Sequence, residues 1–111
     1  MRLQQSRDFS RIKLQGRRLT NGCLIGNWSE LPTGVFCRLG VVTSKKLGHA
    51  PVRSRARRLL REVFRQHQHD FVRPVDLVLI ARSSIVHKSY AEVEKDFLAL
   101  LRRGGLLNNA D

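Results

Sequence analysis

The sequence is short of acidic residues, and this shortage limits the functions that the chain can have. Nine Asp and Glu stand against 21 Lys and Arg among 111 residues. A metal-dependent nuclease needs carboxylates gathered on neighbouring elements, whereas the acids here are scattered or alternate along one predicted helix. The chain also has no GxSxG, Walker-type or GxGxxG motif. We therefore expect no catalytic residue, no bound metal or cofactor and no small-molecule substrate.

Cysteines and long apolar runs are also scarce. Cys23 and Cys37 lie in separate apolar runs and form neither a CxxC motif nor a disulfide framework. No stretch approaches the ~20 apolar residues of a membrane-spanning helix, and the opening MRLQQSRDF lacks the apolar region of a secretory signal peptide. These features predict a reduced, cytoplasmic protein with both cysteines buried as small hydrophobic residues and with no membrane partner.

The histidines and aromatic rings give weak signals for metal binding or base stacking. No Cys or carboxylate motif accompanies the histidines, and His67 and His69 fall on different faces of a helix, so solvated roles are expected. Aromatic residues make up 6% of the chain, which limits the platforms on which unpaired bases could stack. The four histidines are His49, His67, His69 and His87.

Positive charge is what the chain has in excess. The net charge is +12 and the sequence pI is near 11.4, which is more than solubility needs. The charge is densest in residues 44–65, SKKLGHAPVRSRARRLLREVFR, where eight Lys and Arg accompany a single acid, Glu62. This balance predicts a polyanionic partner such as a nucleic acid.

The same segment carries the apolar spacing of a helix. We predict a helix from about Val52 to His69, with one apolar side that packs against the protein and an opposite side that presents arginines. Solvated faces usually mix charges of both signs, whereas every fourth residue from 53 to 65 is an arginine. This unrelieved row favours phosphate binding over a merely solvated face. The apolar side holds Val52, Ala56, Leu59, Leu60, Val63 and Phe64, and the opposite side holds Arg57, Arg58, Arg61 and Arg65.

The chain length predicts one domain, residues 1–111, and its first element is a short helix. Ser6 can cap this helix and Gly16 can end it. Phe9 lies on it among cations, where an aromatic ring could stack on an unpaired base. The alternative is that Phe9 only anchors a helix too short to be stable alone. Both interpretations stay open, and the nearby cations are Arg11, Lys13, Arg17 and Arg18.

Strands are predicted on both sides of the basic helix. The first two run from Cys23 to Trp28 and from Val35 to Ser44, and the turn between them, which contains Pro and Gly, suggests an antiparallel hairpin. Asp76 to Arg82 is continuously apolar at its centre, as expected for a central strand buried on both faces. Ser89 and Glu92 form a capping box that starts a last helix.

The last helix is predicted to end at Gly104, and residues 106–111 are predicted to be a frayed tail. The predicted order is therefore α-β-β-α-β-α, with room for one more short strand.

Residues 44–65 resemble the signature of the bacterial ribonuclease P protein subunit. That family has a Ser-Lys-Lys strand end, a Gly-x-Ala loop, an Arg-Asn-Arg box and an Arg-rich helix that ends in Arg-Glu-x-Phe-Arg. The matching residues are Ser44, Lys45, Lys46, Gly48, Ala50, Arg53, Arg55, Arg57, Arg58, Arg61, Glu62, Phe64 and Arg65. The flanks match at Asp8–Phe9, Gly16–Arg17, Asp76–Arg82 and SYAEVEKDF. The departures are Ser54 in place of the Asn of the box, His49 in place of a common Asn, and Lys13 at a position that is aromatic in some relatives.

The resemblance implies a fold, an activity and partners. The fold would be of the α+β class, a two-layer α/β sandwich of order α-β-β-β-α-β-α with a left-handed crossover through the basic helix. The protein would pair with a catalytic RNA, which with its own Mg2+ ions cuts the 5′ leader from precursor tRNA. The chain would then belong to a ribonucleoprotein enzyme whose chemistry is done by RNA.

The resemblance also implies two sets of binding residues. A cleft between the first helix and the sheet would hold the single-stranded leader, through Phe9, Arg11, Lys13 and Arg17. The strand end, box and basic helix would contact the RNA subunit, through Lys45, Lys46, Arg53, Ser54, Arg55, Arg57, Arg58, Arg61 and Arg65. Two other classes compete with this hypothesis. One is a stand-alone ribosome- or nucleic-acid-binding module, and the other is a metal-dependent nuclease, which the scattered acids disfavour.

Overall fold

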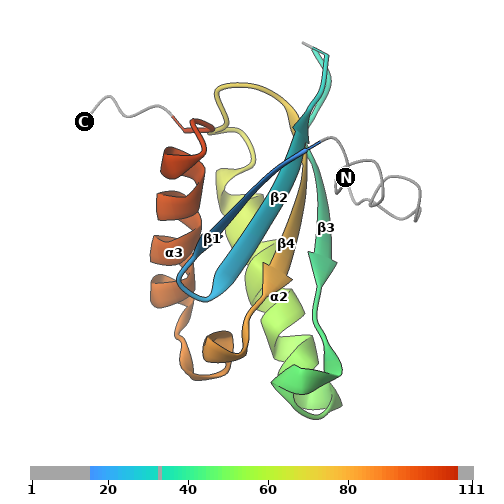
Figure 1. Ribbon diagram of the computed structural model, residues 1–111, viewed down its shortest axis with the longest axis vertical. Coiled ribbons are helices and arrows are strands. Elements are labelled where there is room, and N and C mark those ends of the chain that lie inside the picture. Colours follow the sequence, from blue (N-terminus) through green and yellow to red (C-terminus); the bar gives the residue numbers. More distant parts are fainter. Residues whose placement is uncertain (1–15, 33, 108–111) are drawn as a thin grey trace.

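The computed structural model describes residues 16–32 and 34–107, in which a four-stranded sheet is covered on one face by two long helices (Figure 1). The strands and helices follow the order β-β-β-α-β-α, so the predicted α+β class is confirmed. The predicted helix around Phe9 lies outside the described residues. The elements are β1 (Arg17–Asn21), β2 (Leu24–Glu30), β3 (Arg38–Val42), the short 3-10 helix η1 (Lys45–Leu47), α2 (Ala50–His67), β4 (Val75–Ala81), the 3-10 helix η2 (Ser83–His87) and α3 (Tyr90–Arg103).

The strands are ordered β1-β2-β4-β3 across the sheet. β2 pairs with β1 and β4 in antiparallel fashion, and β3 pairs with β4 in parallel. The predicted hairpin between the strands around Cys23–Trp28 and Val35–Ser44 is therefore wrong, because β4 lies between them. β4 is buried along almost its whole length, and its apolar run takes the central position, with a hydrogen-bonded strand on each side. The hairpin partner of β2 is instead β1.

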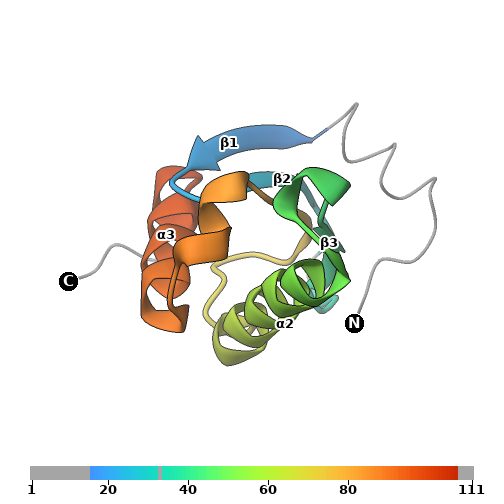
Figure 2. The same cartoon turned by 90° about the horizontal axis from the view of Figure 1, so that it is seen from below.

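The connection from β3 through α2 to β4 is a left-handed crossover. In Figure 1 β3 and β4 both point downward, β3 lies to the right of β4, and α2 lies behind the sheet. Figure 2 shows both long helices on the same side of the sheet, with α3 below β1 and β2 and α2 below β3. Most parallel β-α-β units are right-handed, so this crossover confirms the exception that the resemblance implied.

The core lies between the sheet and the helices. Trp28, Leu77 and Leu79 contribute from the strands, and Leu60 and Phe97 contribute from the helices, all at most 2% exposed. Burying side chains of this size stabilises a fold by roughly 1.5–3 kcal/mol each. Two glycines allow close packing of α3 on β2. A Cβ at Gly26 would lie 2.6 Å from Leu100 Cδ2, and one at Gly104 would lie 2.7 Å from the Trp28 ring.

The ends of the helices follow local signals in the sequence. α2 begins at Ala50, two residues before the predicted start, with Pro51 in its first turn, where a missing N–H costs little. At the start of α3 the Glu92 backbone N–H donates to Ser89 Oγ at 3.2 Å, and the Ser89 N–H donates to Glu92 Oε1 at 3.0 Å. The predicted capping box is thus confirmed, and Gly104 is the C-cap of α3.

The segment after α3 does not fray at its start. Leu106 is fully buried, its N–H donates to the Leu101 carbonyl at 2.8 Å, and its own carbonyl accepts from the Val72 N–H at 2.9 Å. Gly105 has φ 73°, a conformation that glycine adopts without strain and that turns the chain back onto the core. The predicted frayed tail is therefore wrong for Leu106 and Leu107, because leucines next to an apolar surface gain by burial.

The two cysteines differ in how deeply they are buried. Cys23 is buried, as predicted. The prediction is wrong for Cys37, which is only partly buried because it lies next to the exposed residues Val35 and Phe36 before β3. Burial and the neighbouring Asp96 carboxylate raise the pKa of the Cys23 thiol to about 12, so this thiol is not a nucleophile at neutral pH.

None of the helices in the described part of the chain has the length and apolar character needed to cross a membrane.

Candidate nucleic-acid interface

The two sides of α2 are as different as its sequence predicts. Ala56, Leu60, Val63 and Phe64 are buried against the core. On the other side Arg58 and Arg65 are exposed, and Arg57 and Arg61 are partly exposed. Because α2 packs by its apolar side, its backbone is fixed, and the arginines project from a rigid support. Such a support lowers the entropy that is lost when the side chains bind phosphate.

Arg57 is held in place by two hydroxyl groups. Its Nη1 donates to Thr43 Oγ1 at 2.8 Å, and its Nη2 donates to Ser54 Oγ at 3.1 Å. Thr43 follows β3 directly, so this arginine links the end of the strand to the first turns of the helix. Ser54, the residue that replaces the usual Asn of the box, thus orients an arginine. A guanidinium group held in this way keeps further N–H donors for phosphate oxygens.

The other two residues of the box have different surroundings. Arg55 Nη2 donates to the Lys88 carbonyl at 2.8 Å, which ties the helix to the segment after η2. Arg53 is partly buried, and its Nε has no hydrogen-bond partner among the described residues. A buried N–H donor without a partner costs about 1–3 kcal/mol, so an incoming acceptor such as phosphate would be favourable there.

Lys45 and Lys46 extend the basic surface beyond the helix. Both are exposed on η1, while the next residue, Leu47, is buried and anchors this short turn to the core. The turn leads through Gly48 into α2, and the two elements are in contact. The structure therefore brings both lysines to the N-terminal end of the arginine row.

Arg65 differs from the other arginines because an acid neutralises it. Its guanidinium group makes two contacts with the Glu62 carboxylate, at 2.6 and 3.0 Å. Hydrogen bonds from Arg65 and Gln66 lower the pKa of Glu62 to about 2, so the carboxylate stays charged at any physiological pH. The sequence shows that Glu62 is close to the arginine row, but the choice of Arg65 as its partner depends on side-chain geometry.

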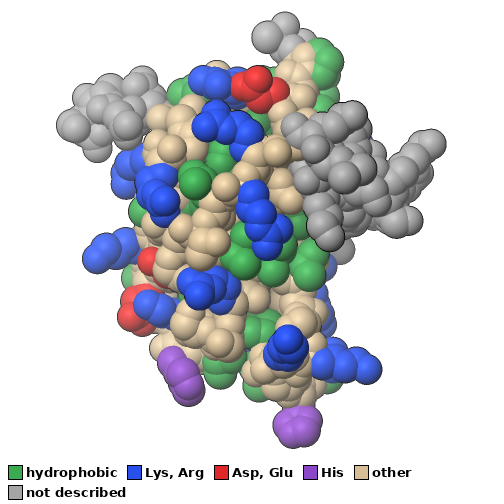
Figure 3. All heavy atoms as spheres, in the orientation of Figure 1, with side chains coloured by type: hydrophobic (Ala, Val, Ile, Leu, Met, Phe, Trp, Pro, Cys, Tyr) green, Lys and Arg blue, Asp and Glu red, His purple; other side chains and the backbone are tan. Residues whose placement is uncertain are grey.

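The sheet face opposite the helices forms a second polar surface, which faces the viewer in Figure 3. Strand register places Arg18, Asn27, Arg38, Val78 and Ile80 on it. Arg38 forms a bidentate ion pair, at 2.6 and 2.7 Å, with the fully buried carboxylate of Asp76 on the same face. Apolar side chains and cations lie together on this face, and this combination can accommodate the bases and phosphates of a single strand.

Arg17 lies at the edge of this face rather than on it. It pairs with Trp28 across β1 and β2, so its side chain projects toward the helix side of the sheet. Its guanidinium carbon is 5.9 Å from the centre of the Trp28 ring, within the range of a cation–π contact. The open face carries its neighbour Arg18 instead. The other predicted leader-binding residues, Phe9, Arg11 and Lys13, lie outside the described residues.

Comparison with known proteins identifies the family. The model of the ribonuclease P family matches residues 1–105. The chain belongs to the ribonuclease P protein family. Curated relatives named ribonuclease P protein component include one from Geobacillus sp. (strain WCH70), which is 33% identical over 106 residues and is matched over 96% of this chain and 91% of its own length. Another, from Syntrophomonas wolfei, is 34% identical over 95% of this chain and 87% of its own length.

Solved structures of ribonuclease P proteins have the same fold. A Staphylococcus aureus RNase P protein mutant with defective mRNA degradation activity superposes with a TM-score of 0.87 at 25% identity, covering 96% of this chain and 89% of its own. The RNase P protein from Thermotoga maritima superposes with a TM-score of 0.80 at 30% identity, covering 93% and 96%. The resemblance of residues 44–65 to the ribonuclease P protein signature is thus confirmed.

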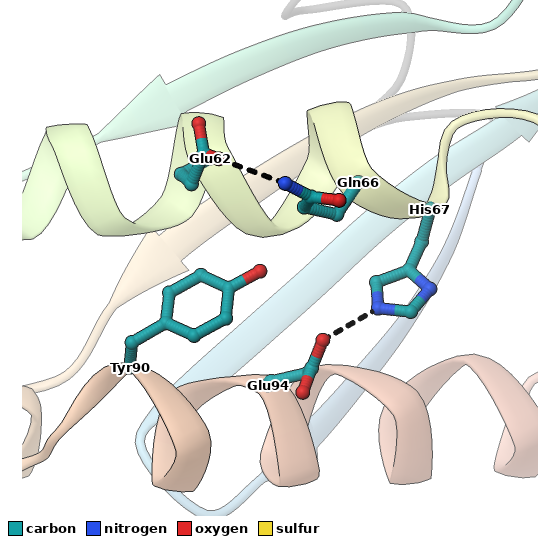
Figure 4. A pocket seen from close by; sticks show the side chains of 5 residues that line it. All are labelled: Glu62, Gln66, His67, Tyr90 and Glu94. Carbon is teal, nitrogen blue, oxygen red and sulfur yellow. Dashed lines mark hydrogen bonds and ion pairs between the residues drawn. The ribbon is translucent and has the colours of Figure 1, made fainter.

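The protein also has an acidic pocket between α2 and α3 that its sequence did not predict (Figure 4). Glu62, Gln66 and His67 line it from α2, and Tyr90 and Glu94 line it from α3, around a volume of about 440 Å³. Two carboxylates make this pocket unfavourable for phosphate. In residues 16–32 and 34–107 no three His, Cys, Asp or Glu side chains converge to hold a metal ion.

His67 links the two helices at this pocket. Its Nε2 is 2.8 Å from Glu94 Oε2, and its Nδ1 is 3.0 Å from Asp70 Oδ2. Burial lowers the pKa of His67, but the hydrogen bonds and charges of the two carboxylates outweigh it, so the pKa is raised above its ordinary value. The predicted solvated role of His67 is therefore wrong, because α3 brings Glu94 to a histidine that lies 27 residues earlier.

Proposed function

We propose that this chain is the protein subunit of a ribonucleoprotein ribonuclease P that removes the 5′ leader of precursor tRNA, with the cleavage carried out by the RNA subunit. The observation that carries the proposal is the rigid arginine side of α2, in a chain that belongs to the ribonuclease P family. The positive charge of this side, the fixed position of Arg57 and the unpaired donor on Arg53 all suit phosphate.

The RNA subunit is proposed to bind the surface around the first turns of α2. Phosphates would be bound by the side chains of Lys45, Lys46, Arg53, Ser54, Arg55, Arg57, Arg58, Arg61 and Arg65. Within this set Arg57 is oriented by two hydrogen bonds, whereas Arg65 is already paired with Glu62. We expect Arg57 to contribute more than Arg65, since less entropy and less competing charge oppose its contact.

The leader is proposed to lie on the open face of the sheet, with Phe9, Arg11, Lys13 and Arg17 among its contacts. Val42 and Ile80, which pair at the junction of β3 and β4, offer apolar surface to unstacked bases. Arg17 would be reached by a leader that continues over the β1 edge toward Trp28.

The chain is proposed to lower the metal requirement of the reaction without binding the metal. Mg2+ would remain on the RNA subunit, where it is expected to take part in the chemistry. The protein brings a net charge of +12 to two polyanions that must associate. Each phosphate neutralised by Lys or Arg releases counterions, so less Mg2+ should be needed for assembly.

Cleavage of precursor tRNA at low Mg2+ tests the proposal. The reaction is run with the ribonuclease P RNA of the same genome alone, with purified RNA-free protein alone, and with both. Cleavage is expected only when both are present. Robust cleavage by the protein alone would contradict an RNA catalyst, and binding without stimulation would favour a stand-alone nucleic-acid-binding module.

A further inference from the structure

A second group of arginines lies on the opposite side of the molecule from the arginine side of α2. All five are exposed, and they come from β1, the loop before β4 and the end of α3. Among the described residues, the ion pair made by this group is between Arg73 Nη1 and Glu30 Oε1, at 2.8 Å. Figure 3 shows Lys and Arg side chains gathered over α3 and β1, along the left and upper parts of the view. The group, here called the β1–α3 surface, consists of Arg18, Arg73, Arg102 and Arg103, together with Arg17 at its border with the proposed leader path.

Two of these arginines are held in fixed positions. Arg103 Nη1 donates to the Thr20 carbonyl at 2.7 Å and to Asn21 Oδ1 at 3.1 Å, which joins the end of α3 to β1. Arg17 lies over the Trp28 ring. The ring can pack against the end of α3 because residue 104 is a glycine. Any other residue there would place its Cβ 2.7 Å from the Trp28 ring, which is too close. The β1–α3 surface is therefore a rigid cationic surface rather than a set of loose side chains.

The β1–α3 surface is separate from the arginine side of α2, here called the α2 surface. β1 and β3 are the two edge strands, with two strands between them, so at 4.7–4.9 Å per strand the edges are roughly 14 Å apart. On the helix side the acidic pocket with Glu62 and Glu94 lies between α2 and α3. An RNA segment that crossed this pocket would meet carboxylates. The two cationic surfaces are therefore suited to different segments of RNA.

We propose that the β1–α3 surface binds the phosphate backbone of a second helical segment of the RNA whose first segment binds α2. The proposal rests on the proposed function in one respect, namely that α2 binds RNA. The aromatic ring at this surface, Trp28, is 2% exposed, so it offers no platform for unpaired bases. A helical segment needs only phosphate contacts. Binding of the first segment places the second at high effective concentration, so a few contacts suffice.

Salt dependence of RNA binding tests the proposal. The variant Arg18→Gln/Arg102→Gln removes two exposed charges whose side chains donate no hydrogen bond within residues 16–32 and 34–107. The matched control, Arg82→Gln/Lys88→Gln, removes the same charge from the segment after β4. With full-length ribonuclease P RNA, the first variant should lower the slope of log affinity against log salt by about 1.4–1.8, which corresponds to two phosphate contacts. The control should leave the slope unchanged.

A short RNA duplex provides the second arm of the test. Bound at the α2 surface, a duplex too short to reach both surfaces should show the same slope with wild type and with Arg18→Gln/Arg102→Gln. Equal slopes for the two double variants with the full-length RNA would overturn the proposal, as would an undiminished slope for Arg18→Gln/Arg102→Gln. The melting curve of Arg18→Gln/Arg102→Gln should match wild type. The control should melt slightly lower, because Arg82 Nη1 donates to the Gly22 carbonyl at 2.9 Å, so affinities are compared at a temperature below both unfolding transitions. A wild-type protein that fails to stimulate cleavage would instead refute the proposed function, so the two failures are distinguishable.

Discussion

Arg57 on α2 donates a hydrogen bond to Thr43 at the end of β3, with 2.8 Å between Nη1 and Oγ1. This contact fixes the direction of an arginine that its helix already holds on the solvent side. It also joins the end of β3 to α2, the helix that carries most of the signature residues of the family. The charge of Arg57 and its orientation can therefore be tested separately.

The first prediction compares Arg57→Ala with Thr43→Val. Arg57→Ala should weaken RNA binding and lower the salt slope by roughly 0.7–0.9, the value for one phosphate contact. Thr43→Val keeps every charge and removes only the acceptor, so it should weaken binding less and leave the slope unchanged. Fluorescence anisotropy over a range of salt concentrations measures both. A slope that changes equally in the two variants would show that Thr43 does not act by orientation.

The second prediction concerns the acid beside the arginine row. Glu62→Gln should strengthen RNA binding, because it releases Arg65 from a bidentate ion pair and removes a negative charge from the interface. The salt slope should increase by up to about 0.9 if Arg65 then contacts a phosphate. Glu92→Gln, at the start of α3, is the control for the loss of one acid. Equal gains in both variants would mean that only net charge matters.

The third prediction tests the buried side of α2. Leu60 is fully buried, so Leu60→Ala should reduce the free energy of unfolding by about 2–5 kcal/mol. Arg58→Ala, on the exposed side, should change it by no more than about 0.5 kcal/mol. Denaturant unfolding measures both, and RNA binding below the unfolding transition should be weakened by Arg58→Ala alone. A large loss of stability in Arg58→Ala together with a small one in Leu60→Ala would show that the buried and exposed sides of α2 are assigned wrongly.

The fourth prediction concerns pH and the contact of His67 with Glu94 and Asp70. Because the pKa of His67 is raised in the folded protein, the imidazolium stabilises the fold fully below the ordinary pKa of about 6.5. This contribution to stability is lost as the pH rises through the pKa that His67 has in the folded protein. The melting temperature of wild type should therefore fall toward that of His67→Gln over this range.

A control separates His67 from the other histidines. His69→Gln, at an exposed position after α2, should keep the pH dependence of wild type. Thermal unfolding followed by circular dichroism over a series of pH values measures the effect. A constant difference in melting temperature between wild type and His67→Gln at all pH values would rule out the ionic contribution.

The fifth prediction concerns Phe9 and the leader. If Phe9 stacks on an unpaired base, Phe9→Ala should weaken holoenzyme binding of precursor tRNA by about 1–3 kcal/mol. Mature tRNA has no leader and should bind as before. If Phe9 only anchors its helix, the variant should lose thermal stability and bind both RNAs equally less well. Binding of both RNAs, measured together with a melting curve, distinguishes the two roles.

Features that depend on residues close together in the chain could be predicted from the sequence. The two sides of α2 follow from apolar residues three and four positions apart, and the start of α3 follows from Ser89 and Glu92. The burial of β4 follows from its continuous apolar run. These patterns act over one or two helical turns or one strand, so the local backbone conformation is enough to express them.

Features that depend on distant segments were decided by the tertiary structure. β4 takes the position between β2 and β3 because strands compete for partners. The hairpin was predicted from two neighbouring strands and the turn between them, so it did not take into account a strand that comes later in the chain. The contacts of His67 with Glu94, of Arg57 with Thr43 and of Arg103 with Thr20 likewise need side chains that meet only after the sheet and helices have packed. The sequence alone therefore determined which residues are cationic and which helix presents them. Packing decided which of those cations are oriented, which are neutralised, and which lie on a second surface, because these properties depend on distances between elements rather than on spacing along the chain.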